Sequence, residues 1–266
     1  MADLNMKTER EREKALTDFN DVADFYDDYR PDYPREAVET IIAKANLTSG
    51  SKILEIGAGS GKATVQFSDF GFEMLCIEPG SNLVDRGNRT LGDKNIKFIA
   101  SRFEDYDEPS KYYDAIISAQ AFHWITQPIG YKKCANTLKD NGLLAMFWQL
   151  DLYNREIDFD REFVDILDKY SGWVSCMPEK DYSARMESIL SKIVGSGLFS
   201  KPEIIHFYWD QVFTADEYYK YMLTGAPFAE TDAERQACRE DLARLADKYD
   251  GIKRRFMCEL YLTRKV

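Results

Sequence analysis

Short apolar runs alternate with longer amphipathic stretches over the first 150 residues of this chain. The runs are rich in isoleucine, leucine and other apolar residues, which is typical of strands buried on both faces of a parallel sheet. The stretches between them repeat apolar side chains at helical spacing. We therefore predict strands at 52–56, 73–77, 96–100, 113–118 and 143–148, and helices at 35–46, 63–69, 81–90 and 127–138.

The order of these elements predicts the fold class. Strands that alternate with helices of about ten residues form a doubly wound, Rossmann-like α/β sheet with helices on both faces. A turn at Asn141-Gly142 is expected just before the fifth strand, because both residue types favour turns. The C-terminal part is less regular, with helices predicted at 158–170, 183–194, 215–223 and 232–248 and strands at 204–212 and 256–262.

No internal repeat or low-complexity linker divides the chain, so we predict one domain over residues 1–266. Residues 1–34 are expected to form an N-terminal arm or lid. Residues 150–182 and 224–250 interrupt the alternation of strands and helices. We expect these two insertions to cover one end of the sheet.

Composition narrows the function by exclusion. The 46 acidic and 35 basic residues give a net charge of −11, which disfavours nucleic-acid partners and anionic membrane surfaces. The sequence has no apolar stretch long enough for a membrane span, and its charged first residues do not resemble a secretory signal. Five dispersed cysteines without a C-x-x-C pair and only two histidines indicate reduced thiols and no metal site. These features predict a soluble cytoplasmic globular protein.

The informative motif is EIGAGSG at residues 55–61, between the first strand and its helix. Glycines allow the backbone to turn tightly and to approach a ligand closely. A phosphate-binding P-loop would need glycine at position 56 and serine or threonine at position 63, where the chain has Ile56 and Ala63. A dinucleotide fingerprint would need glycine or alanine at position 62, where the chain has Lys62. The spacing excludes the first site and weakens the second.

The pattern E-x-G-x-G-x-G resembles the first motif of class I S-adenosylmethionine (SAM) methyltransferases. Glu78 follows 21 residues after Gly57, at the end of the second strand, where an acid can accept the hydroxyls of a ribose. The apolar-plus-acidic pair Phe103-Glu104 follows the third strand, as in that family. The strand expected at 256–262 resembles the antiparallel seventh strand of the same fold.

This resemblance implies a binding site for SAM and for its product S-adenosylhomocysteine, and no metal. Pro79, Leu83 and Phe103 would line the adenine, although Phe103 could equally be core packing, and Glu104 would accept from the adenine amine. Arg30 would pair with a carboxylate. The implied cofactor residues are Glu55, Gly57, Ala58, Gly59, Gly61, Glu78, Pro79, Leu83, Phe103, Glu104, Ala119 and Arg30.

The strings YRPDYP at 29–34 and AFHW at 121–124 resemble the small-molecule branch that includes relatives of trans-aconitate methyltransferase. The branch implies a small-molecule acceptor, with a carboxylic acid among the candidates. His123 would act as a general base if the acceptor carries a proton, or as a pocket wall if it is a carboxylate. Acceptor contacts are expected from Tyr26, Tyr33, Gln120, Phe122, Trp124 and Trp148.

Several alternatives stay open. One is a methyltransferase acting on RNA or protein, although the N/D-P-P-aromatic tetrad of many nitrogen-directed enzymes is absent at 118–121. The others are a nicotinamide-dependent Rossmann-like oxidoreductase and a SAM-binding protein without activity. Either a monomer or a homodimer is compatible with the sequence, and the acceptor is not identified by it.

Overall fold

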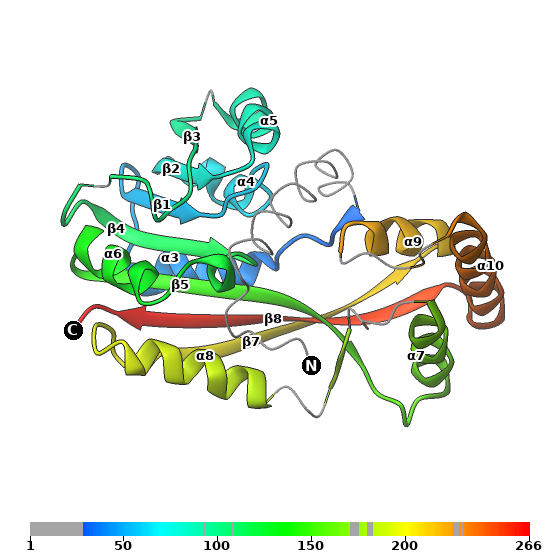
Figure 1. Cartoon of the computed structure of the whole chain (residues 1–266). Helices are drawn as coiled ribbons and strands as arrows, with labels where there is room; N and C mark the ends of the chain where they lie inside the picture. The colour runs from blue at the N-terminus through cyan, green and yellow to red at the C-terminus, as the bar shows by residue number, and fades with distance from the viewer. Residues whose placement is uncertain are drawn as a thin grey trace.

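The computed structural model describes residues 29–92, 94–107, 109–170, 176–179, 183–225, 229 and 231–266. One mixed sheet runs through this part of the molecule (Figure 1), in the strand order β3-β2-β1-β4-β5-β8-β7 with the short β6 paired to β5. The strands are β1 (Lys52–Ile56), β2 (Glu73–Glu78), β3 (Ile96–Ala100), β4 (Tyr113–Ala119), β5 (Leu138–Tyr153), β6 (Met177–Pro178), β7 (Glu203–Phe213) and β8 (Ile252–Arg264).

Strands β1 to β5 pair in parallel, whereas β8 lies antiparallel between β5 and β7. One core cluster packs helices α3 (Arg35–Ala45), α4 (Thr64–Phe67) and α5 (Ser81–Leu91) on one face of the sheet. A second cluster packs α6 (Ile129–Thr137) and α8 (Ser183–Gly195) on the other face. The predicted fold class, a Rossmann-like sheet with an antiparallel last strand and helices on both faces, is confirmed.

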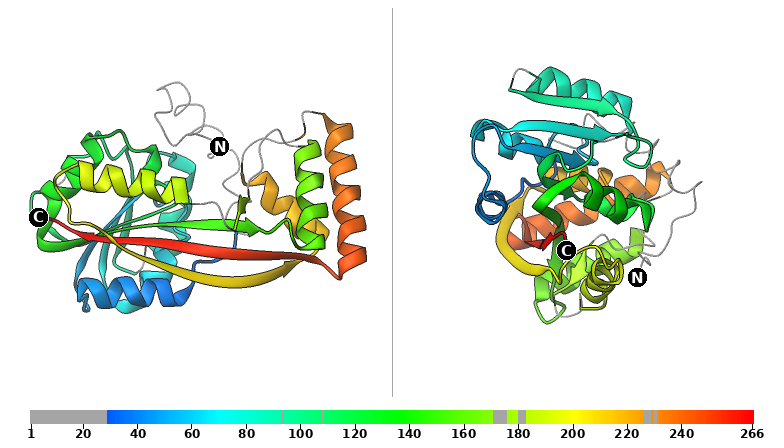
Figure 2. Two further views of the ribbon diagram at one scale, coloured as in Figure 1. Left: turned by 90° about the horizontal axis from the view of Figure 1, so that it is seen from below. Right: turned by 90° about the vertical axis from the view of Figure 1, so that its left-hand side faces the viewer.

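A second group of helices lies away from this sheet core. Helices α7 (Asp158–Tyr170), α9 (Ala215–Leu223) and α10 (Asp232–Tyr249) share their own apolar cluster with the ends of β7 and β8. Figure 2 shows β5, β7 and β8 running as long ribbons from the sheet core into this group. We call α7, α9, α10 and the strand ends beside them the helical lobe.

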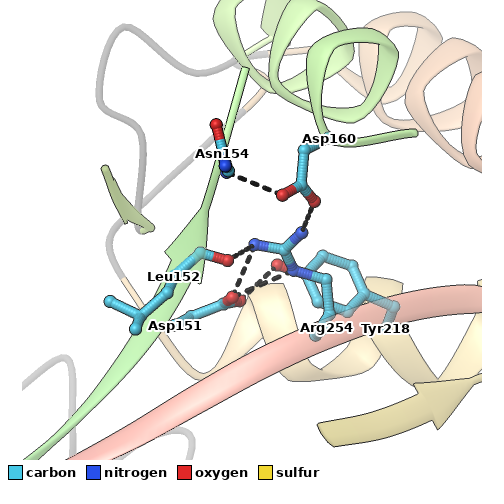
Figure 3. A network of polar contacts seen from close by, with 6 residues as sticks. All are labelled: Asp151, Leu152, Asn154, Asp160, Tyr218 and Arg254. Atoms are coloured by element: carbon cyan, nitrogen blue, oxygen red, sulfur yellow. Dashed lines mark hydrogen bonds and ion pairs between the residues drawn. The ribbon is translucent and has the colours of Figure 1, made fainter. Parts of the chain in front are cut away.

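A buried ion-pair network ties the helical lobe to the long strands (Figure 3). Arg254 of β8 is 1% exposed and donates from Nε and Nη2 to Asp151 Oδ1 of β5, at 2.9 and 2.7 Å. Its Nη1 donates to Asp160 Oδ1 of α7 at 2.9 Å, and Tyr218 of α9 donates to Asp151 Oδ2 at 2.9 Å. The guanidinium therefore joins β8, β5 and α7 directly, and Asp151 links α9 to the same network.

The fifth strand differs from its prediction. It spans Leu138–Tyr153 instead of 143–148, because its second half pairs with β8 as far as Leu152. The predicted turn at Asn141-Gly142 lies inside this strand as an irregularity, where Tyr113 pairs with Leu138 but Ala115 pairs with Leu143. Asn141 has a φ of 66°, so the local bend was anticipated but not the strand that continues through it.

Most other elements agree with the predicted pattern. The strands at 52–56 and 96–100 and the helices at 158–170 and 215–223 have the predicted bounds. The side chain of Thr214 caps α9 by accepting a hydrogen bond from the Glu217 backbone, in a reciprocal capping box. Among the residues that the structure describes, none of the helices has the length and apolarity that a membrane crossing requires.

Candidate functional site

The glycine loop follows β1 at the carboxyl edge of the parallel strands, where ligands of α/β folds bind. Gly57 and Gly59 have φ values of 68° and 60°, a region that favours glycine. A side chain at Gly57 would lie 2.3 Å from the Cβ of Ala121, so the loop touches the segment after β4. A side chain at Gly59 would meet no atom of the described residues within 4 Å. The first glycine permits close packing, and the second faces open space.

Glu78 lies directly against this loop. Its Oε2 accepts a hydrogen bond from the Gly59 backbone at 3.0 Å, and its Oε1 accepts one from the Gly80 backbone at 2.9 Å. Burial raises the pKa of the Glu78 carboxyl, and the two backbone donors partly oppose that shift. The structure thus brings together two of the residues expected to bind the cofactor, Glu78 and Gly59.

Glu55 is the second buried acid of the loop. Thr64, the first residue of α4, donates to Glu55 Oε2 at 2.7 Å. Glu55 Oε1 is buried without a hydrogen-bond partner among the described residues. Burial raises the pKa of Glu55 to about 8, and the nearby Glu78 adds to the shift. Glu55 is therefore largely protonated at neutral pH.

The pair that follows β3 consists of a buried ring and a half-buried acid. The ring of Phe103 is 2% exposed and packs in the core cluster of α6 and α8. This position agrees with the alternative that Phe103 is part of the core. Glu104 Oε1 accepts a hydrogen bond from the Thr126 backbone at 2.8 Å. Burial opposes ionisation of Glu104, but the Thr126 donors and Arg102 outweigh it and hold its pKa below the usual value. Pro79 and Leu83 lie beside Glu78, at the start of α5.

The segment after β4 carries the residues expected to contact the acceptor. Gln120 has a φ of 56° and donates from Nε2 to the Gln149 carbonyl at 2.8 Å. A short 3-10 helix, η2 (Phe122–Trp124), follows, and Phe122 is buried against Tyr131. The rings of His123 and Trp124 lie 5.1 Å apart.

Trp148 joins this segment from β5. Its indole Nε1 donates to His123 Nδ1 at 3.2 Å. The fifth strand was predicted to end at Trp148, but it continues to Tyr153 and leaves Trp148 only 4% exposed. Trp148 reaches the site from the strand interior.

The N-terminal segment links the site to the helical lobe. Arg30 donates from Nε to Thr224 Oγ1 at 2.9 Å and from Nη2 to the Thr224 carbonyl at 3.1 Å. Tyr33 packs edge-on against Phe147 of β5, with ring centres 5.0 Å apart. The third candidate from this segment, Tyr26, lies outside the described residues.

Sequence reasoning missed the residues that hold these side chains. Thr64 gave a usable signal, since it lies close after the glycine loop and opens the next helix. Other supporting residues gave no signal, because they come from distant parts of the chain. Arg185 lies over the Trp148 ring, Glu259 pairs with Trp148 in the sheet register, and Thr224 accepts from Arg30.

Comparison with known proteins shows similarity to methyltransferases. A family model described as "Methyltransferase domain" matches residues 26–189. A Dictyostelium discoideum protein described as a methyltransferase is 30% identical over 129 residues, which cover 48% of each chain. A Saccharomyces cerevisiae protein described as an S-adenosylmethionine-dependent methyltransferase is 29% identical over 165 residues, covering 60% of this chain and 53% of the yeast protein. The chain spans about half the length of the curated relatives it matches.

Solved structures show the same fold at low sequence identity. A methyltransferase structure from Anaeromyxobacter dehalogenans superposes with a TM-score of 0.60 and 17% identity, covering 89% of this chain and 97% of that one. A SAM-dependent methyltransferase from Thiobacillus denitrificans, in complex with S-adenosylhomocysteine, gives 0.53 and 15% and covers 98% and 100%. These likenesses establish the architecture and leave the chemistry to be argued from the site.

Proposed function

The chain belongs to the methyltransferase-domain family, and from that premise we propose that it transfers the methyl group of SAM to a small-molecule acceptor. The observation that carries the proposal is the pairing of Glu78 with the open glycine loop. A carboxylate held at 3.0 Å from the Gly59 backbone, beside a position with no side chain within 4 Å, suits a ribose that lies across the loop. Ribose hydroxyls would then take the place of the backbone donors on Glu78.

The chain's own residues fit SAM by two further features. Glu55 Oε1 is a buried polar atom with no partner among the described residues, as expected for an acid that is completed by a ligand or by water. Pro79 is half-buried next to Glu78 and Leu83 is buried in the first turn of α5, so apolar side chains border the loop on this side. When bound, SAM supplies an electrophilic methyl group on a sulfonium. The residues of the chain need only orient the two reactants and exclude water.

The acceptor is proposed to lie beside η2, between Gln120, Trp124 and the His123–Trp148 pair. Among small molecules we favour a carboxylic acid, because a carboxylate attacks as its anion and leaves no proton to remove. Arg30, held by Thr224 at the helical lobe, is the proposed cationic contact. The helical lobe and the segment that contains Arg30 are proposed to cover this space and to keep it dry.

Calorimetry tests the cofactor site. SAM and S-adenosylhomocysteine should bind, and NADH should not; the opposite result would replace the proposal with an oxidoreductase. Glu78→Ala should weaken SAM binding at least tenfold, because hydrogen bonds to a charged group contribute about 1.5–3 kcal/mol each. Glu73→Ala is the matched control, since this exposed acid lies at the far end of the same strand and should leave SAM binding unchanged.

The acceptor class needs a separate test. Purified protein with radiolabelled SAM should methylate members of a carboxylic-acid panel to base-labile esters, and RNA and protein should stay unlabelled. Labelled RNA or protein would overturn the acceptor class, and SAM binding without any transfer would indicate a non-catalytic SAM protein. A monomeric or homodimeric state and a cytoplasmic setting belong to the same proposal, and the setting is supported by five buried cysteines that form no disulfide.

A further inference from the structure

The hydrogen bond between Trp148 and His123 determines which ring nitrogen of the neutral histidine carries the hydrogen. An indole nitrogen has one hydrogen and donates only. The imidazole nitrogen that faces Trp148 Nε1 at 3.2 Å must therefore be unprotonated and accept. In the neutral ring the proton is then on the other nitrogen. Because Nδ1 is the nitrogen that faces the indole, that proton is on Nε2.

Trp148 is held in place from several sides. Trp148 lies in the interior of β5 and is 4% exposed. The Arg185 guanidinium of α8 lies over the indole at 5.1 Å, and Tyr261 of β8 packs edge-on at 5.7 Å. Arg185 in turn donates to Glu259, the β8 residue that pairs with Trp148 in the sheet register. We call Arg185, Tyr261 and Glu259 the Trp148 brace.

The brace fixes the indole independently of the solvent. Glu259 is fully buried and the Arg185 side chain is 12% exposed, so the ion pair behind Trp148 is largely shielded from water. Rotation of the indole away from His123 would break both ring contacts. Packing therefore fixes the direction of the indole N–H, and this donor selects one tautomer of His123.

We propose that Trp148 is a positioning residue that fixes His123 in the Nε2–H tautomer, so that His123 acts as a hydrogen-bond donor and not as a general base. The inference rests on the proposed function, because it assigns a role at the acceptor end of the methyltransferase site. In the transfer, the acceptor oxygen forms a bond to the methyl carbon while the carbon–sulfur bond breaks and its electron pair goes to sulfur. His123 accepts no proton and orients the acceptor through Nε2–H.

Nuclear magnetic resonance of histidine nitrogens tests this directly. The chain has two histidines, so a protein labelled with ¹⁵N-histidine gives signals from two rings, and the pair lost in His123→Gln belongs to His123. With S-adenosylhomocysteine bound at neutral pH, His123 should show a protonated Nε2 and an unprotonated Nδ1. A proton on Nδ1 in the native protein would overturn the proposal.

Trp148→Phe removes the indole donor and keeps an aromatic ring for the brace. The share of the Nδ1–H tautomer should rise about fivefold, the factor that corresponds to a typical neutral hydrogen bond. Trp209→Phe is the control, because Trp209 stacks on Phe256 in another part of the molecule. An unchanged His123 spectrum in Trp148→Phe, or an equal change in Trp209→Phe, would refute the positioning role.

Ligand binding separates this inference from the proposed function. Both tryptophan variants should bind S-adenosylhomocysteine within about twofold of the native protein, since neither ring lies at the glycine loop. If the ligand binds but the tautomer is wrong, the role of Trp148 fails and the methyltransferase proposal stands. If the tautomer is right but neither SAM nor its product binds, the function fails and the tautomer remains a property of the fold.

Discussion

Ionisation of Glu55 should make the folded protein less stable as the pH rises. Burial raises the Glu55 pKa from 4.5 to about 8, so the folded state keeps a proton that the unfolded chain releases between these two values. The free energy of unfolding therefore falls as the pH rises across this window, and the loss is complete above pH 8. Each pKa unit corresponds to about 1.4 kcal/mol, so ionisation in the folded state costs about 5 kcal/mol.

Glu55→Gln is the perturbation that isolates this effect. Glutamine has nearly the shape of the protonated acid and cannot ionise, and its carbonyl can still accept from Thr64. Its amide needs a partner at the Oε1 position, which adds a cost that is the same at every pH. The informative quantity is thus the difference in pH dependence between variant and native protein, not the stability at one pH.

Urea unfolding between pH 5 and pH 9 measures that difference. Relative to the native protein, Glu55→Gln should gain stability steadily up to about pH 8 and should gain none beyond it. Glu73→Gln, an exposed acid on the neighbouring strand, provides the control and should follow the native curve. A Glu55→Gln curve parallel to the native one would show that Glu55 ionises normally, and the reasoning from burial would be refuted.

Three further variants test other parts of the structure. Gly57→Ala should abolish SAM binding measured by calorimetry, because its Cβ would meet Ala121. Gly50→Ala is the control, since Gly50 also has a positive φ but has no atom within 4 Å of an added Cβ. It should retain SAM binding and lose about 1–2 kcal/mol of stability in urea unfolding. Arg254→Met leaves the buried Asp151 and the half-buried Asp160 without their cation and should cost about 3–5 kcal/mol by the same assay. An unchanged midpoint would contradict the network's role. Thr224→Val removes one acceptor of Arg30 and should speed proteolysis of the segment at 29–34 while SAM affinity stays within about threefold.

The parallel half of the sheet could be predicted because its signals are local. Each buried strand is a short apolar run bounded by turn residues, and the bounds of β1 and β3 agree with the prediction. The glycine loop was equally accessible, since EIGAGSG and the acid at Glu78 are defined by spacing along the chain. The structure brings Gly59 and Glu78 into contact, and the family model confirms the resemblance that these residues indicated.

The helices of the helical lobe could be predicted, but their attachment to long strands could not, for a physical reason that β5 illustrates. The apolar run at 143–148 marks the part of the strand that is buried in the sheet core. Its continuation to Tyr153 is less apolar and includes Asp151, which is buried at 3% exposure because Arg254 neutralises it. A charged residue in a sequence predicts an exposed position unless its ion-pair partner is known. The partner of Asp151 is Arg254, which lies 103 residues further along the chain.

The long strands also limit how the site can open. Strand β8 is hydrogen-bonded without interruption to β5 from Leu143 to Leu152 and to β7 from Glu203 to Phe213, so three paired strands join the sheet core to the helical lobe. A hinge between the two would have to bend this ladder and strain the Arg254 network. By contrast, the segment at 29–34 is tied to the lobe by side-chain contacts, among them two hydrogen bonds from Arg30 to Thr224. Access to the glycine loop should therefore change at the Arg30–Thr224 contact before it changes at the strands, which is why the Thr224→Val variant is read by proteolysis of residues 29–34 and not by global unfolding.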